Sequence, residues 1–424
     1  MTLDEQTTVV PNRRIASVDA LRGLVVFAMI YVNDIAGVSR EIVPAWMRHF
    51  RGPDGMTFVD LVFPAFVFVV GMSVPLALGA RLGRGEPAWK CLVHVVIRTL
   101  SLLFIGVIMV NGRPDSDRMG WSGALWSTLM FLSAMLAFSS LRWPRKGESS
   151  PDRERTVRRI TVGLRVLGLA SLVVLAFAYR GRDGHRIITL SPFSIHTEWY
   201  GILGLIGWAY LVASIVSVVF RDHRTALLGC FVLLLCLYPA DRTGAFRGFW
   251  LARIVGIGGT LGSLGAIAVG GALLASVLRA PDVTTVGARA KSVLLFVAGC
   301  SVGAWLLDGL YGINKNSATP SWCLWACAIT ASLWLLFHLL ADVRPQSAPA
   351  KLCAPLTAAG ANVLLAYLIS EMLPSVLNLL GLGGWYWRLA EPGLAHAMAR
   401  SIGCAILILA ATAGLNRIGF RLKL

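Results

Sequence analysis

Long apolar runs, each about the length of a membrane-spanning helix, dominate this 424-residue sequence. A helix that crosses the hydrocarbon core of a bilayer needs about 20 mostly apolar residues. Hydrophobic residues make up 56% of the chain and charged residues only 14%, whereas soluble domains carry about 25% charged residues. So much apolar surface cannot be hidden in one soluble core. The sequence therefore predicts an all-α integral membrane protein in a lipid bilayer, and it excludes fibrous, disordered and disulfide-rich secreted classes.

About twelve such runs (10–12) predict a polytopic helix bundle that forms one integrated membrane domain. The run at Thr225–Ala240 is short. We expect N-terminal helices in residues 1–141, a charged linker at 142–159 and C-terminal helices in 160–424. The expected helices are Leu21–Ala36, Thr57–Ala80, Ala88–Val110, Met119–Leu141, Ile160–Tyr179, Trp199–Phe220, Thr225–Ala240, Thr260–Leu278, Ser292–Tyr311, Trp322–Ala341, Leu356–Leu379 and Leu394–Leu415.

The basic residues indicate how these helices cross the membrane. The chain has 39 Lys and Arg against 22 Asp and Glu, a net charge of +17. With the helices assigned as above, 22 basic residues fall on the side of the N-terminus, 13 on the other side and four within or at the ends of helices. Loops rich in Lys and Arg stay in the cytoplasm, so we expect both termini and the 142–159 linker to be cytoplasmic. The excess charge is then topological, and no nucleic-acid partner is expected.

Polar side chains near the outer end of the first two helices are the clearest candidates for chemistry. Asn33 ends the first helix, His49 lies in the loop that follows, and Asp60 opens the second helix. His is suited to proton transfer near neutral pH, a carboxylate can fix its tautomer, and an amide can hold a substrate or an oxyanion. Ionisable groups at membrane depth are costly and therefore point to function. The loop 37–60 is the candidate active-site loop.

Other signals favour structure over chemistry. Asp19 and Arg22 are three residues apart and predict an ion pair at the inner end of the first helix. The glycine run Gly256–Gly271 lacks a phosphate-binding motif, so close helix packing explains it better. No C-x-x-C pair occurs among the eight cysteines, and we expect no metal site.

Weaker polar signals recur along the chain and carry no function alone. They are Arg98 and Asn111 on the third predicted helix, His196, Glu198 and Trp199 around the start of the sixth, Asp308 on the ninth, and Asn362 and Glu371 on the eleventh.

Several blocks of sequence together resemble a known family. The sequence is similar to the heparan-α-glucosaminide N-acetyltransferases, a family of transmembrane acyltransferases, in their shorter bacterial form. The blocks appear in the family's order and cover nearly the whole chain. They are Ser17–Gly23 with Met29 and Asn33, Asp60–Gly71, Gly201–Tyr210, Ile313–Asn316 with Thr319–Ser321, and Gly360–Tyr367.

The resemblance implies a transmembrane acyltransferase fold in the bacterial inner membrane. It also implies acetyl transfer from cytoplasmic acetyl-CoA, a co-substrate, to the amine of an amino sugar on the outer side. His49 matches the family's active histidine, and Asp60 and Asn33 match its flanking acid and amide. A homodimer is expected from the family's habit. The cofactor-binding candidates are Arg22 and Arg98, which would meet the CoA phosphates, together with Asn314, Lys315 and Asn362.

Two mechanisms and two other functions remain open. His49 would act as a base on the amine or would carry the acetyl group itself, with Asp60 orienting it and Asn33 binding the thioester oxygen or the acceptor. About twelve helices with polar groups at membrane depth also suit a sugar or amino-sugar transporter. A membrane scaffold is the third alternative.

Overall fold

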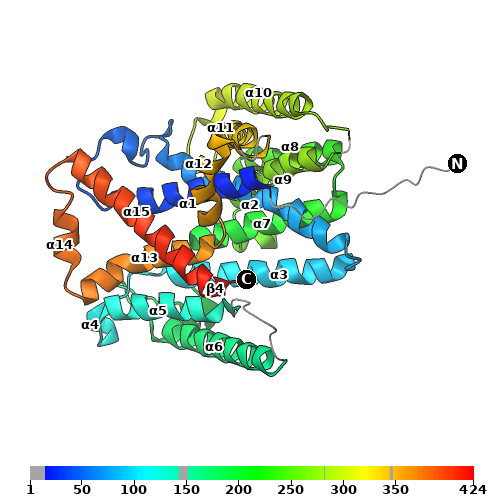
Figure 1. Cartoon of the computed structure of the whole chain (residues 1–424). Helices are drawn as coiled ribbons and strands as arrows, with labels where there is room; N and C mark the ends of the chain where they lie inside the picture. The colour runs from blue at the N-terminus through cyan, green and yellow to red at the C-terminus, as the bar shows by residue number, and fades with distance from the viewer. Residues whose placement is uncertain (1–14, 143–150, 281, 344–346) are drawn as a thin grey trace.

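The computed structural model describes residues 15–142, 151–280, 282–343 and 347–424, which fold almost entirely into helices (Figure 1). The helices are α1 (Ala16–Ile35), α2 (Val59–Leu82), α3 (Ala88–Val110), α4 (Ser116–Met119), α5 (Gly123–Ala137), α6 (Pro151–Ala178), α7 (Gly201–Phe220), α8 (Arg224–Arg242), α9 (Gly265–Arg279), α10 (Val286–Tyr311), α11 (Pro320–Phe337), α12 (Ala348–Ala359), α13 (Val363–Leu379), α14 (Gly383–Arg388) and α15 (Leu394–Arg417).

Short elements connect or extend these helices. Two 3-10 turns lie at Ala45–Met47 and Trp250–Arg253, and π-helical segments at Ile257–Leu264 and His338–Asp342 run into α9 and out of α11. Strands β1 (Ser139–Leu141) and β4 (Phe420–Leu422) pair antiparallel, as do β2 (Ile188–Leu190) and β3 (Phe193–Ile195).

Ten helices in the described residues are long and apolar enough to cross a membrane, which confirms the polytopic all-α class. The pair α12 and α13, bent by 79°, supplies an eleventh span if it counts as one. The apolar helix α5 has only 15 residues, and it corresponds to the predicted run Met119–Leu141. The predicted run at Thr225–Ala240 is part of α8, a full candidate span of 19 residues.

The charged linker predicted at 142–159 is partly helical. Residues 143–150 lie outside the described part of the chain, whereas α6 begins at Pro151 and includes the rest of the linker. Asp152 and Glu154 lie in the first turn of α6, where carboxylates interact favourably with the helix dipole.

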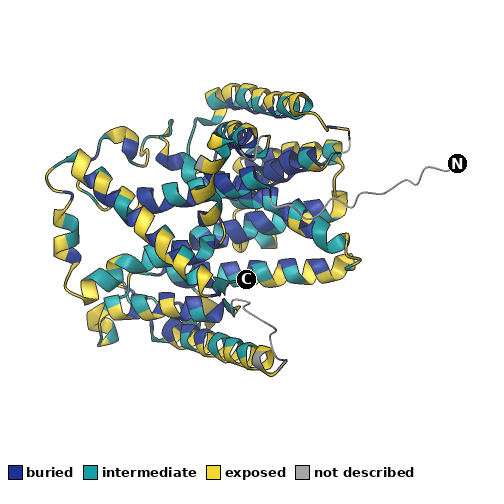
Figure 2. Ribbon diagram, in the orientation of Figure 1, coloured by how far each residue is buried: buried dark blue, intermediate teal, exposed yellow. Residues whose placement is uncertain are grey.

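The helix α9 lies at the centre of the bundle. Its span is 89% buried, whereas that of α10, at one edge, is 17% buried (Figures 1 and 2). Small residues allow this central position: a Cβ on Gly271 of α9 would lie 2.1 Å from the carbonyl oxygen of Phe68 in α2, and a Cβ on Gly71 of α2 would lie 1.9 Å from that of Ala268. The predicted role of the glycine run in close packing is therefore confirmed. The exposed apolar faces of α6 and α10 fit contact with lipid.

One end of the bundle carries both the start of α1 and strand β4; we call it the terminus end. The Lys423 backbone N–H donates to the carbonyl of Phe138 (2.8 Å), next to the β1–β4 pair. Arg22 and Lys423 line one cavity. The predicted ion pair between Asp19 and Arg22 is confirmed at 2.7 Å.

Candidate active site

Asp60 is a buried carboxylate in the first turn of α2, at the opposite end of the bundle. It is 1% exposed. Its Oδ2 accepts hydrogen bonds from the backbone N–H groups of Phe50 (3.0 Å) and Thr57 (3.1 Å), and its Oδ1 lies 2.8 Å from Nδ1 of His49. The Thr57 hydroxyl donates to the carbonyl of Arg48 (2.8 Å), which holds both ends of this loop together. Two fixed donors on Oδ2 favour the ionised carboxylate and orient it toward His49.

His49 is held by this carboxylate but remains accessible. Because Asp60 can only accept, we assign the Nδ1 proton of His49 to the hydrogen bond with Oδ1. The Nε2 atom then keeps its lone pair, and the side chain is 47% exposed. A histidine oriented by a buried carboxylate is the arrangement that enzymes use for a general base.

Lys315, from the loop between α10 and α11, joins the pair. Its Nζ lies 3.1 Å from Nδ1 of His49 and 3.7 Å from Oδ1 of Asp60. Since Nδ1 carries a proton, the ion pair with Asp60 is the favourable contact of the ammonium. Burial lowers the pKa of Lys315, and the charge of Asp60 opposes this shift.

Asn314 ties the two loops together. Its Nδ2 donates to the carbonyl of Pro53 (3.1 Å), and the neighbouring Ile313 N–H donates to Oδ1 of Asp54 (2.7 Å). The Gly55 N–H returns a bond to the carbonyl of Ile313 (2.8 Å). These contacts place Asn314 and Lys315 beside His49 and not at the terminus end.

A cavity of about 650 Å³, the His49 cavity, opens beside this group. Its volume lies in the range typical of small-molecule sites. The walls combine His49 and Lys315 with Glu198, Trp199, Tyr200 and Trp322. The Tyr200 hydroxyl donates to the carbonyl of Ile254 (2.7 Å), and burial raises its pKa, so the phenol stays neutral.

A second cavity, the basic cavity, has a volume of about 510 Å³ and begins at the terminus end. It contains three of the predicted cofactor-binding residues, Arg22, Arg98 and Asn362. Arg98 stacks over the ring of Tyr210 (4.7 Å), and its buried Nε has no hydrogen-bond partner among the described residues. Ile202 lines both cavities, so they adjoin at the start of α7.

Asn362 reaches the basic cavity because the helix is broken there. The break between α12 and α13 spans Gly360 to Asn362, and Nδ2 of Asn362 donates to Oδ1 of Asn416 (3.0 Å). Sequence reasoning did not assign three further lining residues, Arg81, His94 and Lys423, to any site. The sequence shows that these side chains are basic or titratable, but Arg81 and Lys423 were interpreted only as loop charges that orient the chain in the membrane.

Asn33 lies apart from the other two predicted catalytic residues. Its Nδ2 donates to Oε1 of Glu371 on α13 (2.7 Å), and it lines a separate cavity of about 80 Å³. The neighbouring Asp34 is fixed by Arg400 (2.8 Å) and Ser401 (2.6 Å). In the described part of the chain, no hydrogen bond joins Asn33 to His49 or Asp60.

Comparisons with known proteins agree with the resemblance seen in the sequence. Residues 14–182 match the model of a family described as a domain of unknown function, DUF5009. The chain is 39% identical to heparan-alpha-glucosaminide N-acetyltransferase of Mus musculus over 108 residues. This aligned region covers 26% of this chain and 16% of the relative. The relative of the same name from Homo sapiens is 36% identical over 108 residues, 26% of this chain and 15% of the relative. The resemblance to these N-acetyltransferases is confirmed, and the match spans about a sixth of the length of these curated relatives.

Proposed function

We propose that this protein is a membrane-bound N-acetyltransferase that moves an acetyl group from acetyl-CoA to the amine of an amino sugar. The observation that carries the proposal is the His49–Asp60 pair, 2.8 Å apart, in a cavity that adjoins a basic cavity from the opposite end of the bundle. The similarity to two N-acetyltransferases supports the reaction type.

The basic cavity suits the donor. Acetyl-CoA carries phosphates at one end and a thioester at the end of a long, narrow arm. Arg22, Arg81, Arg98 and Lys423 supply positive charge at the terminus end, and guanidinium groups bind phosphate strongly. The arm would extend toward Ile202, where the two cavities adjoin. The distribution of loop charges supports a cytoplasmic terminus end in a bacterial inner membrane.

In the proposed reaction, Nε2 of His49 accepts a proton from the acceptor amine as the nitrogen attacks the thioester carbonyl. The C–N bond of the amide forms, the C–S bond breaks, and the imidazolium of His49 returns the proton to the leaving CoA thiolate. Asp60 holds the tautomer of His49 and stabilises the imidazolium that forms. Lys315 keeps positive charge beside the pair. Asn33 has no place in this proton transfer, since its amide is engaged by Glu371.

Turnover by the purified protein tests the proposal. Wild type in lipid nanodiscs should release CoA from acetyl-CoA when glucosamine is added, and His49→Ala should lose nearly all of this activity. His396→Ala is the control, because His396 is an exposed histidine on α15 outside both cavities. Unchanged turnover in His49→Ala would contradict the proposed role of this residue.

A transporter is the second candidate, favoured by two cavities that share the lining residue Ile202 and by the broken helix α12–α13. Transporters bind substrates at such interrupted helices near the middle of the membrane. Uptake of glucosamine into proteoliposomes without CoA, and with no acetylated product, would favour this function over acetyl transfer.

A further inference from the structure

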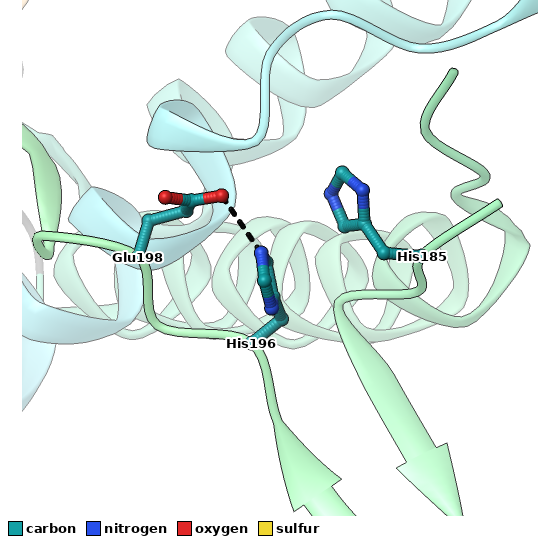
Figure 3. Close-up of side chains that lie close together, drawn as sticks. All are labelled: His185, His196 and Glu198. Atoms are coloured by element: carbon teal, nitrogen blue, oxygen red, sulfur yellow. Dashed lines mark hydrogen bonds and ion pairs between the residues drawn. The ribbon is translucent and has the colours of Figure 1, made fainter. Parts of the chain in front are cut away.

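The segment between α6 and α7 brings together two histidines and a carboxylate that the acetyl-transfer proposal does not use. One ligand atom from each of His185, His196 and Glu198 lies within 4.8 Å of the others (Figure 3). In Figure 3, His185 and Glu198 lie on either side of His196. The cluster adjoins the active site, since Glu198 also lines the His49 cavity.

A β-hairpin creates this proximity. His185 comes shortly before β2 and His196 directly follows β3, whose register pairs Ile188 with Ile195. The His196 N–H also donates to the carbonyl of Ile187 (2.9 Å), which continues the ladder. The centroids of the two imidazole rings are therefore 4.4 Å apart although the residues are 11 positions apart in sequence.

The hydrogen-bond partners around the two rings are mostly acceptors. Asp183 pairs with Nδ1 of His185, and Oδ1 of Asn111 lies 3.0 Å from Nε2 of the same ring. Glu198 Oε1 lies 2.7 Å from Nε2 of His196. Two neutral imidazoles carry one N–H each. The oxygens of Asp183, Asn111 and Glu198 are three acceptors, so one of them has no N–H to accept from. A further positive group, either a proton or a cation, satisfies the third contact.

The orientation of Asn111 is fixed, so the excess of acceptors cannot be removed by turning its amide. Asn111 is 3% exposed, and its Nδ2 donates to the carbonyls of Val107 (2.8 Å) and His196 (3.1 Å). Its oxygen must therefore face His185.

The backbone at Glu198 also indicates a specific position for this carboxylate. Glu198 has φ +47°, and Tyr200 has φ +66°, a left-handed conformation that costs free energy for residues other than glycine. Such strain is found where surrounding contacts hold a side chain in a functional place.

We propose that His185, His196 and Glu198 bind one divalent transition-metal ion of the zinc class. Two imidazoles and one carboxylate are a ligand set that zinc sites use, with a further position open to water or substrate. Asp183 is the outer partner that fixes the tautomer of His185, as carboxylates do beside zinc-bound histidines. The bound ion would join the β2–β3 hairpin to the segment that carries Trp199 and Tyr200 into the His49 cavity.

The site differs from the expectation of no metal, which rested on the spacing of the cysteines. Only the hairpin brings His185 beside His196. The inference does not depend on acetyl transfer, because zinc binding can be measured without turnover.

Zinc binding to the full-length protein tests the proposal. Wild type in detergent, stripped with a chelator, should take up one Zn²⁺ per chain in competition with a chromophoric chelator. His196→Ala and Glu198→Gln should abolish this binding, Asp183→Asn should weaken it about 10- to 100-fold, and His396→Ala should bind as wild type does.

A second measurement separates loss of the site from loss of the fold. Each variant should elute as wild type does on size exclusion and should melt at the same temperature in chelator. Zn²⁺ should raise the melting temperature of wild type and of His396→Ala, but not that of His196→Ala or Glu198→Gln. Absence of zinc binding by wild type would overturn the proposal and leave a proton as the positive group. Undiminished binding by both His196→Ala and Glu198→Gln would also overturn it.

Discussion

Nδ1 of His49 lies 2.8 Å from Oδ1 of Asp60, and the carboxylate is buried while half of the imidazole is exposed. The backbone N–H groups of Phe50 and Thr57 hold the other carboxylate oxygen. The loop that precedes α2 therefore fixes the acid, and the acid fixes the histidine. Substitution of Asp60 should therefore affect the site through the orientation of His49.

Asp60→Asn should abolish most acetyl transfer with little change in KM for either substrate. The amide no longer stabilises an imidazolium and no longer selects the Nδ1–H tautomer, so kcat should fall about 10²- to 10⁴-fold. Steady-state CoA release measures both constants. A variant that keeps wild-type kcat would separate Asp60 from the chemistry.

Arg98→Gln should weaken binding of acetyl-CoA but not of the sugar. Loss of a charge-assisted bond to a phosphate costs about 1.5–3 kcal/mol, so KM for acetyl-CoA should rise at least about tenfold. Arg155→Gln is the matched control, because Arg155 is an exposed arginine in the first turns of α6. Equal effects of the two substitutions would count against a donor site in the basic cavity.

Lys315 should make stability depend on pH in the alkaline range. Burial lowers its pKa in the folded protein, with Asp60 opposing the shift, while the unfolded chain keeps the ordinary value of 10.5. Between these two values the unfolded state binds more protons, so the contribution of Lys315 to stability rises as pH rises. Melting curves at several pH values should show that the melting temperature of wild type rises relative to that of Lys315→Met as the pH approaches 10. A difference in melting temperature between the two proteins that stays constant with pH would contradict the lowered pKa of Lys315.

Gly71→Ala should destabilise the protein severely. The new Cβ would lie 1.9 Å from the backbone oxygen of Ala268, so α2 and α9 must separate. Overpacking of this kind costs about 1–3 kcal/mol or more. Gly163→Ala is the control, since a Cβ there meets nothing within 4 Å on the exposed face of α6; its effect should be neutral or stabilising by about 0.5–1 kcal/mol. Thermal unfolding in detergent compares the two variants.

Much of the fold was predictable because membrane insertion depends on local composition. The length of each apolar run decides whether a helix can cross the bilayer, and this property needs no knowledge of neighbours. The predicted runs correspond to candidate spans, to the bent pair α12–α13 or to the short helix α5. The bend itself and the start of α6 at Pro151 were not predicted, since packing decides where a helix breaks and how far it extends beyond the apolar core.

The candidate site was also predictable only where its contacts are local in sequence. The pairing of His49 with Asp60 joins two residues 11 positions apart, one in the loop before α2 and one in its first turn, and the sequence alone indicated it. Asn33 precedes His49 by only 16 positions, yet it bonds to Glu371, 338 positions away. Residues near in sequence are brought together only if their side chains face the same neighbour, and this depends on which helices pack beside them.

The sequence by itself determined the membrane class, the approximate number of helices and the candidate loop, because these follow from hydrophobic length and from short-range connection. The tertiary structure decided which distant residues complete the site. Lys315 reaches His49 across 266 positions of chain, and the two cavities adjoin at Ile202. Such contacts depend on the packing of α2, α7 and α9, where small residues allow close approach and select one arrangement of helices that all look alike in hydropathy.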